Sequence, residues 1–239
     1  MGARSREPAD PRFPPADREA GARAAGPEEM KLGAVVPAAG LSRRMGREKI
    51  LLPFGGSTML GTVLAKLAKA NVARTVVVLR PDLPEAEEAA RRAGAEIVVN
   101  PHPEDEMLSS IRLGVERISA TVDAAFVWPA DHPAVARGTL ERLAAAGSRE
   151  TAVLPVYGGR RGHPALVGAG LLEEIAQIPP NEGLRFLWRN RADAVEEIVV
   201  DDPGVVENLD DRETYERALR RDSQSREPRL DGDRPEETE

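Results

Sequence analysis

The sequence contains no cysteine and only three histidines in 239 residues. Without cysteine, the chain can form neither a disulfide scaffold nor a thiolate metal site. His102, His132 and His163 lie about thirty residues apart, which is unlike the close spacing of a histidine zinc motif. We therefore expect neither disulfides nor a histidine metal cluster.

Long apolar runs and a positive charge balance are also missing. No run approaches the roughly eighteen apolar residues of a membrane span, and the charged N-terminus lacks the apolar core of a signal peptide. The net charge of −7 disfavours general nucleic-acid binding, because a phosphate backbone requires a basic surface. These absences favour a cytoplasmic protein that binds neither nucleic acid nor membrane.

The chain has a hydrophobic share of 41%, enough for a folded core, between two polar ends. Residues 1–29 are rich in Arg, Pro, Ala and Glu and show no apolar periodicity, so they cannot bury enough surface to offset the entropy of ordering. Residues 221–239 have the same polar character. We predict a disordered tail over 1–29, one folded domain over 30–220 and a second disordered tail over 221–239.

Short apolar segments alternate with helical segments throughout the predicted domain. This alternation predicts parallel β-α-β units in a three-layer α/β domain, with ligands at the carboxyl ends of the strands. The strand segments are 32–37, 74–80, 96–100, 123–131, 151–157, 163–168 and 195–200, and the helices are 57–70, 84–94, 108–119, 136–146, 169–177, 183–190 and 211–220.

The loop after the first strand combines glycine with positive charge. Gly40 and Gly46 permit tight turns and the close approach of a ligand. Successive backbone N–H groups in such a turn can bind an anion, and cations can neutralise phosphate oxygens. The loop is neither a P-loop nor a Gly-x-Gly-x-x-Gly motif. It predicts a triphosphate site, and the alternative is a solvated basic loop. Its four cations are Arg43, Arg44, Arg47 and Lys49.

Residues 38–49 read Ala-Ala-Gly-Leu-Ser-Arg-Arg-Met-Gly-Arg-Glu-Lys, and Leu-Leu-Pro-Phe-Gly-Gly follows at 51–56. This order resembles the signature of the MobA-like nucleotidyltransferases, which include the guanylyl- and cytidylyltransferases of the molybdenum cofactor. The resemblance covers residues 30–218. It implies a Rossmann-like, GT-A-like domain with a mostly parallel sheet, which transfers a nucleoside monophosphate from an NTP to a phosphorylated acceptor with Mg²⁺. The nucleotide-binding residues it implies are Ala38, Ala39, Gly40, Ser42, Arg44 and Lys49, of which Arg44 and Lys49 are also catalytic.

A second segment, Met-Leu-Ser-Ser-Ile-Arg-Leu-Gly at 107–114, follows Asn100 and a proline. It is similar to a family stretch that lies against the base and ribose, which implies that Ser109 and Ser110 bind the nucleotide. Glu106 stands where the family has glycine. The alternative role for both serines is helix N-capping.

Asp131 lies in the sequence Trp-Pro-Ala-Asp-His-Pro, directly after a predicted central strand. An acidic residue at the carboxyl end of a strand suits Mg²⁺, which takes one or two carboxylates together with phosphate oxygens and waters. The matching aspartate of the family binds Mg²⁺ beside the α-phosphate, so the resemblance implies a metal-binding, catalytic role for Asp131. The alternative is an aspartate that only caps the next helix.

Near the end of the predicted domain, Asn208 and Asp210 match polar positions that complete the family's metal site. Arg212 and Thr214 depart from the pattern, because the family has a proline and an acid there. Asp210 or Asp211 is alternatively the N-cap of the final helix.

The acceptor and the base are assigned by the resemblance alone. Arg161 and His163 lie in Arg-Gly-His-Pro, which resembles a stretch on the acceptor side of the cytidylyltransferase branch; a structural histidine is the alternative for His163. With Ala-Ala-Gly at 38–40, this stretch favours CTP and molybdopterin, and would make a molybdoenzyme the client of the product. Three alternatives stay open: guanylyl transfer, cytidylyl transfer to methylerythritol phosphate, and nucleotidyl transfer to a sugar phosphate or an alditol phosphate.

Two functions of other classes are also considered. A non-catalytic maturation chaperone for the molybdenum cofactor would have no need of Arg44, Lys49 and Asp131 around an α-phosphate. A glycosyltransferase of related fold typically binds its metal with Asp-x-Asp, whereas Asp131 is followed by histidine and proline.

Overall fold

An eight-stranded mixed β-sheet forms the centre of the computed structural model, which describes residues 30–41 and 48–226. The main strand order is β10-β7-β9-β6-β1-β4-β5, and β8 pairs with β7 at its side. The strands are β1 (Leu32–Pro37), β4 (Arg74–Leu79), β5 (Glu96–Val99), β6 (Ala124–Val127), β7 (Ala152–Tyr157), β8 (Arg160–Arg161), β9 (Ala165–Gly168) and β10 (Val195–Val199).

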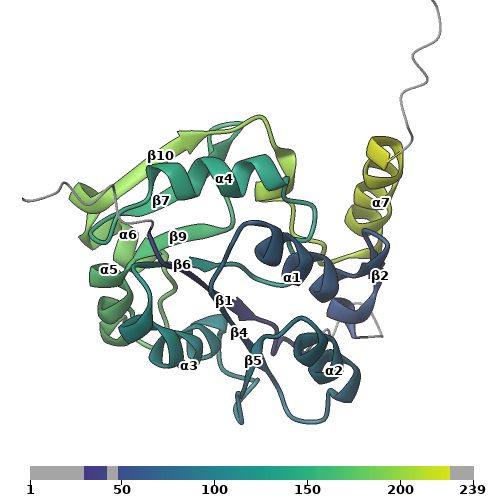
Figure 1. Cartoon of the computed structure of the whole chain (residues 1–239), viewed down its shortest axis with the longest axis horizontal. Coiled ribbons are helices and arrows are strands. Elements are labelled where there is room, and N and C mark those ends of the chain that lie inside the picture. Colours follow the sequence, from purple (N-terminus) through teal and green to yellow (C-terminus); the bar gives the residue numbers. More distant parts are fainter. Residues whose placement is uncertain (1–29, 42–47, 227–239) are drawn as a thin grey trace, which may run out of the picture.

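Helices cover both faces of this sheet, as the predicted three-layer α/β fold requires (Figure 1). Side chains alternate between the faces along a strand. On β1, Ala34 and Val36 pack with one set of helices, whereas Val35 packs with the other. The first set is α1 (Met59–Lys69), α2 (Pro84–Arg92) and α4 (Arg137–Ala146), and the second is α3 (Met107–Ile118), α5 (Ala169–Glu174) and α6 (Arg185–Asn190).

The sheet is mostly parallel, and β9 is the main exception. It lies between β6 and β7 and runs antiparallel to both. Only residues 158–164 connect β7 to β9, whereas a parallel partner requires a crossover of roughly a dozen residues or more. The short connection therefore dictates the reversed direction of β9.

A small hairpin precedes α1, where the sequence pattern predicted helix from residue 57. Strands β2 (Pro53–Phe54) and β3 (Ser57–Thr58) pair antiparallel. Gly55 and Gly56 form the turn with φ of 67° and 79°, a conformation that favours glycine. The helix begins only after Thr58, whose side chain accepts a hydrogen bond from the Gly61 amide.

The final helix, α7 (Arg212–Arg226), extends beyond the domain boundary predicted at residue 220. It packs on the hairpin: Tyr215 Oη donates a 2.6 Å hydrogen bond to Pro53 O, and Ala218 joins a cluster with Phe54 and Met59. This contact supports the first turns of a helix whose sequence is otherwise polar. Short 3-10 helices complete the described chain: η1 (Lys49–Leu51), η2 (Ser119–Thr121), η3 (Ile175–Gln177), η4 (Ala192–Ala194) and η5 (Pro203–Val206). Among the described helices, none has the length and apolar character needed to cross a bilayer.

Candidate active site

A pocket of about 460 Å³ opens beyond the carboxyl ends of β1 and β6. The strand order reverses at β1, which has β4 on one side and β6 on the other, and such switch points are where open α/β sheets bind ligands. The pocket is lined by Pro37, Ala38, Ala39, Gly40, Leu41, Lys49, Ile50, Pro103, Asp105, Met107, Ser110, Ala130, Asp131, Asn208 and Asp210.

The segment after β1 forms one wall of this pocket. Ala38 and Ala39 are buried, and the Ala38 amide donates a 2.8 Å hydrogen bond to Val78 O at the end of β4. Gly40 is exposed. The predicted roles of Ser42 and Arg44 fall outside the described residues.

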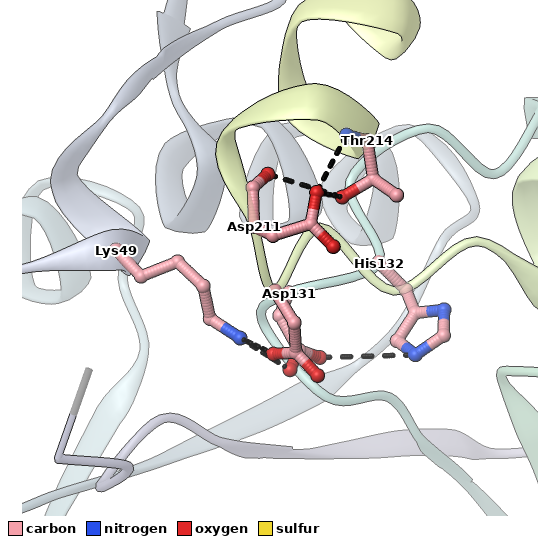
Figure 2. A network of polar contacts seen from close by, with 6 residues as sticks. Lys49, Asp131, His132, Asp211 and Thr214 are labelled. Atoms are coloured by element: carbon pink, nitrogen blue, oxygen red, sulfur yellow. Dashed lines mark hydrogen bonds and ion pairs between the residues drawn. The ribbon is translucent and has the colours of Figure 1, made fainter. Parts of the chain in front are cut away.

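Lys49, Asp131 and Asp210 all line the pocket. Figure 2 shows the Lys49 side chain pointing toward Asp131. Lys49 Nζ donates a 2.8 Å hydrogen bond to Asp131 Oδ2 and a second one to Asp210 Oδ1. The partners lie 82 and 161 positions from Lys49 in the sequence. The fold thus brings together three charged groups that the sequence assigned to one site.

The surrounding charges favour the charged forms of both Lys49 and Asp131. Burial alone would lower the pKa of Lys49, but the two carboxylates raise it above its ordinary value. Burial would likewise raise the pKa of Asp131, yet the neighbouring His132 and the Lys49 ammonium lower it overall. An ammonium therefore faces a carboxylate at neutral pH.

Two hydrogen bonds to backbone carbonyls hold Asp131 in place. Its carbonyl accepts a 3.1 Å hydrogen bond from the Leu209 amide, next to Asp210. Trp128 Nε1 donates a 3.0 Å bond to His132 O and closes the loop after β6. Helix α4 begins after Ala136, whose amide bonds to Asp202 rather than Asp131. The alternative role of Asp131, a cap for the next helix, is therefore wrong.

The oxygen atoms in this pocket suit a hard divalent cation. Asp131 Oδ1 and Asn208 Oδ1 are buried without a hydrogen-bond partner, and buried polar atoms normally have one. Mg²⁺ usually needs only one or two carboxylates, with phosphates and waters as its other ligands. A cluster of three or more His, Cys, Asp or Glu side chains suited to a metal does not occur among residues 30–41 and 48–226.

The adjacent residues Asp210 and Asp211 have different partners. Asp211 Oδ1 accepts a 2.8 Å hydrogen bond from the Thr214 amide at the start of α7, and this bond lowers the pKa of Asp211. Asp211 is therefore the helix cap, and Asp210 is the residue that faces Lys49.

On the opposite wall, Asn100 organises the start of α3. Its Nδ2 donates 3.0 Å hydrogen bonds to Ser109 Oγ and Ser110 Oγ. Ser110 lines the pocket, whereas Ser109 is not among the lining residues. The N-cap of α3 is Glu106, with φ −62° and ψ 162°, so the serines are not caps. Any residue adopts that conformation, and the family's glycine is not required there.

Three contributors to the site were not among the site residues predicted from the sequence. Asp105, in the loop before α3, and Met107, the first residue of α3, line the pocket. Arg80, just after β4, donates a hydrogen bond to Glu48 and so anchors the residue before Lys49. A charged residue directly after a central strand is the signal that pointed to Asp131, and it would also have found Arg80.

Arg161 and His163 lie apart from the pocket lining. Arg161 Nε donates a 2.6 Å hydrogen bond to Glu197 at the sheet edge. The His163 ring lies 4.7 Å from the His132 ring, centroid to centroid, and its Nδ1 is buried without a hydrogen-bond partner. Burial, followed by the neighbouring His132, lowers the pKa of His163 to about 3. Between these two residues, Gly162 packs so closely on the Val205 backbone that a Cβ would clash.

A family model described as the MobA-like NTP transferase domain matches residues 34–195, from β1 to the start of β10. The chain belongs to the MobA-like NTP transferase family. Like other members, it is a nucleotidyltransferase that binds an NTP, and the family typically uses a divalent metal.

Among its relatives is the molybdenum cofactor cytidylyltransferase of Escherichia coli (strain K12), 28% identical over 63% of this MobA-like chain and 77% of the relative. The nicotine blue oxidoreductase of Paenarthrobacter nicotinovorans is 28% identical over 77% of this chain and 95% of the relative. A crystal structure of Rv0371c from Mycobacterium tuberculosis in complex with manganese is 26% identical, covers 80% of this chain and 99% of that one, and has a TM-score of 0.65.

Proposed function

We propose that this transferase moves CMP from CTP to the terminal phosphate of molybdopterin, with Mg²⁺ as its metal. The observation that carries this proposal is the meeting of Lys49, Asp131 and Asp210 in the pocket beside residues 38–40. Carboxylates favour a divalent cation, and an ammonium favours phosphate oxygens. Both are needed around a triphosphate, whereas a chaperone that only carries a finished cofactor needs neither.

The proposed reaction is an attack by an acceptor phosphate oxygen on the α-phosphorus of CTP. A P–O bond forms to the acceptor, the bond to the β-phosphate breaks, and pyrophosphate leaves. A phosphate nucleophile is largely ionised near neutral pH, so no side chain has to remove a proton. The protein therefore acts by positioning the reactants and neutralising their charge.

The chain's own residues have distinct parts in this scheme. Lys49 neutralises phosphate oxygens, and the walls formed by residues 38–40 and Ser110 position the nucleotide. Asp131, Asp210 and Asn208 would hold Mg²⁺ through the oxygens that face the pocket. The bound cation would act as a Lewis acid toward the α-phosphate.

The choice of CTP rests on sequence likeness. The relative in Escherichia coli is named a molybdenum cofactor cytidylyltransferase, and the Ala-Ala-Gly and Arg-Gly-His-Pro stretches resemble that branch. Arg161 and His163 are not among the residues that line the pocket. They can contact the acceptor only if it extends beyond this pocket. A guanylyltransferase or a sugar- or alditol-phosphate enzyme would use the same Lys49 and Asp131.

The experiment that tests this proposal is thermal denaturation with Mg²⁺ and CTP, GTP, UTP or ATP, followed by a pyrophosphate-release assay with molybdopterin. A ligand at 100 times its Kd stabilises a protein by about 2.7 kcal/mol, which shifts the melting temperature measurably. We expect CTP to give the largest shift and molybdopterin to trigger pyrophosphate release. Asp131→Asn should lose both responses, whereas Asp201→Asn, at an exposed position, should keep them.

Other outcomes would change the assigned nucleotide, the assigned acceptor or the reaction itself. A shift with GTP alone would make the protein a guanylyltransferase, and release with a sugar or alditol phosphate would replace molybdopterin as acceptor. If no NTP shifts the melting temperature, the transfer reaction is excluded, and binding of finished cofactor becomes the function to test.

A further inference from the structure

Lys49 occupies the position where a cation would be bound. Its Nζ lies 2.8 Å from Asp131 Oδ2, toward which it points in Figure 2. It also contacts Asp210 Oδ1, so one ammonium bridges both carboxylates. The side chains of Lys49 and Asp131 are each only 13% exposed. Little water is therefore present to screen the charges of this pair.

A divalent cation and this ammonium cannot use the same oxygens at once. If the metal binds Asp131 and Asp210 while Lys49 stays, three positive charges face two carboxylates in a partly buried pocket. The favoured state after metal binding has the ammonium elsewhere, and the nearest strong anion in the reaction is the triphosphate. Asp131 Oδ1 and Asn208 Oδ1, which have no hydrogen-bond partner, remain to complete the ligand set.

On the basis of the function proposed above, we propose that Lys49 is an internal counter-ion that blocks the cation site until an NTP draws its ammonium away. In the metal-free protein, Lys49 then links three segments: η1, the loop after β6 and the segment before α7. Free metal binds weakly, and the metal–nucleotide pair binds strongly because each removes an obstacle to the other. This is a positive coupling between two ligands of one site.

The decisive measurement is the affinity of the purified protein for Mn²⁺ alone, followed by the loss of the free-ion signal in electron paramagnetic resonance. We expect Lys49→Met to bind Mn²⁺ about tenfold more tightly than wild type, within the usual range for coupled sites. Lys49→Arg keeps the charge and should bind Mn²⁺ as weakly as wild type. The double variant Lys49→Met, Asp131→Asn should lose the gain, because the metal then lacks its carboxylate.

Lys69→Met is the matched control, since it removes the same charge from an exposed position on α1. Equal Mn²⁺ affinity for wild type and Lys49→Met, or an equal gain in Lys69→Met, would overturn the blocking role. Should Lys49→Met fail to fold, Lys49→Gln serves as the neutral variant. The measurement contains no nucleotide, so it is independent of the NTP melting experiment. A tighter Mn²⁺ site together with no NTP response would refute the transferase assignment and the release of Lys49 by an NTP, but not the competition between Lys49 and the cation.

Discussion

The Asp202 carboxylate accepts a 2.7 Å hydrogen bond from Thr139 Oγ1, 63 positions earlier in the chain. The same carboxylate accepts bonds from the Ala136 amide at 2.8 Å and the Gly204 amide at 3.0 Å. Asp202 therefore caps α4 and also fixes the start of the segment that leads to Asp210. Asp202 is buried and is not among the residues that line the pocket.

We predict that Asp202→Ala lowers the free energy of unfolding by about 2–4 kcal/mol, because it leaves three donors without their acceptor, two of them on the buried residues Thr139 and Gly204. Urea denaturation at pH 7 measures this change. Asp201→Ala, at the exposed neighbouring position, should stay within about 0.5 kcal/mol of wild type. Equal effects of the two variants would contradict the capping role of Asp202.

Asp210 and Asp211 give a second prediction, because adjacent aspartates have different partners. Asp210 faces Lys49, whereas Asp211 caps α7. We expect Asp210→Asn to lower the rate of pyrophosphate release by roughly 10²-fold, the scale of losing one charge-stabilising group. Asp211→Asn should leave the rate unchanged, since asparagine is an equally good N-cap.

Steady-state assays with saturating CTP and molybdopterin measure both rates. Asp211→Ala adds a check on the structural assignment, because it should destabilise the protein without changing the rate. A loss of rate in Asp211→Asn that matches Asp210→Asn would show that the two residues act together on the metal.

Much of the fold could be predicted because each buried parallel strand is a continuous apolar run. Residues 34–36 in β1 and 76–79 in β4 fulfil this rule. The place of β9 could not be predicted from its residues, since an apolar tetrapeptide fits a parallel or an antiparallel neighbour. Its direction follows from the short connection after β7, which is a property of the chain path.

The candidate site, like the fold, could be predicted from the sequence only in part. Lys49, Asp131 and Asp210 each carried a local signal: a basic loop, an acid after a strand, and a polar motif. Their mutual contact spans 82 and 161 positions, and no local pattern contains it. Asp105 lines the pocket only because the loop before α3 bends toward β1. The catalytic and binding roles of all these residues stay predictions.

The packing of α3 on the sheet yields a third prediction. A Cβ on Gly114 would clash with Val35 on β1 and would crowd Val78 on β4. We expect Gly114→Ala to lower the free energy of unfolding by about 1–3 kcal/mol through overpacking. It should also weaken CTP binding, because Ser110 lies one turn earlier on the same helix face and would move with it.

Gly138→Ala is the matched control, because a Cβ at this exposed position in α4 meets nothing within 4 Å. It should stabilise the protein by up to about 1 kcal/mol through helix propensity. Urea denaturation and CTP titration of both variants check these opposite signs. A neutral Gly114→Ala variant would mean that α3 can move away from β1 at little cost.

His163 gives the last prediction, which concerns pH. Burial and the neighbouring His132 lower the pKa of His163 to about 3, from about 6.5 in an unfolded chain. Between these values the unfolded chain binds a proton that the folded protein does not, so stability falls as pH falls below 6.5 and is retained above it. In EDTA, the difference in unfolding free energy between wild type and His163→Gln should shrink from pH 7 to pH 5. A constant difference for His163→Gln would mean that this ring takes up a proton equally in the folded and unfolded chain.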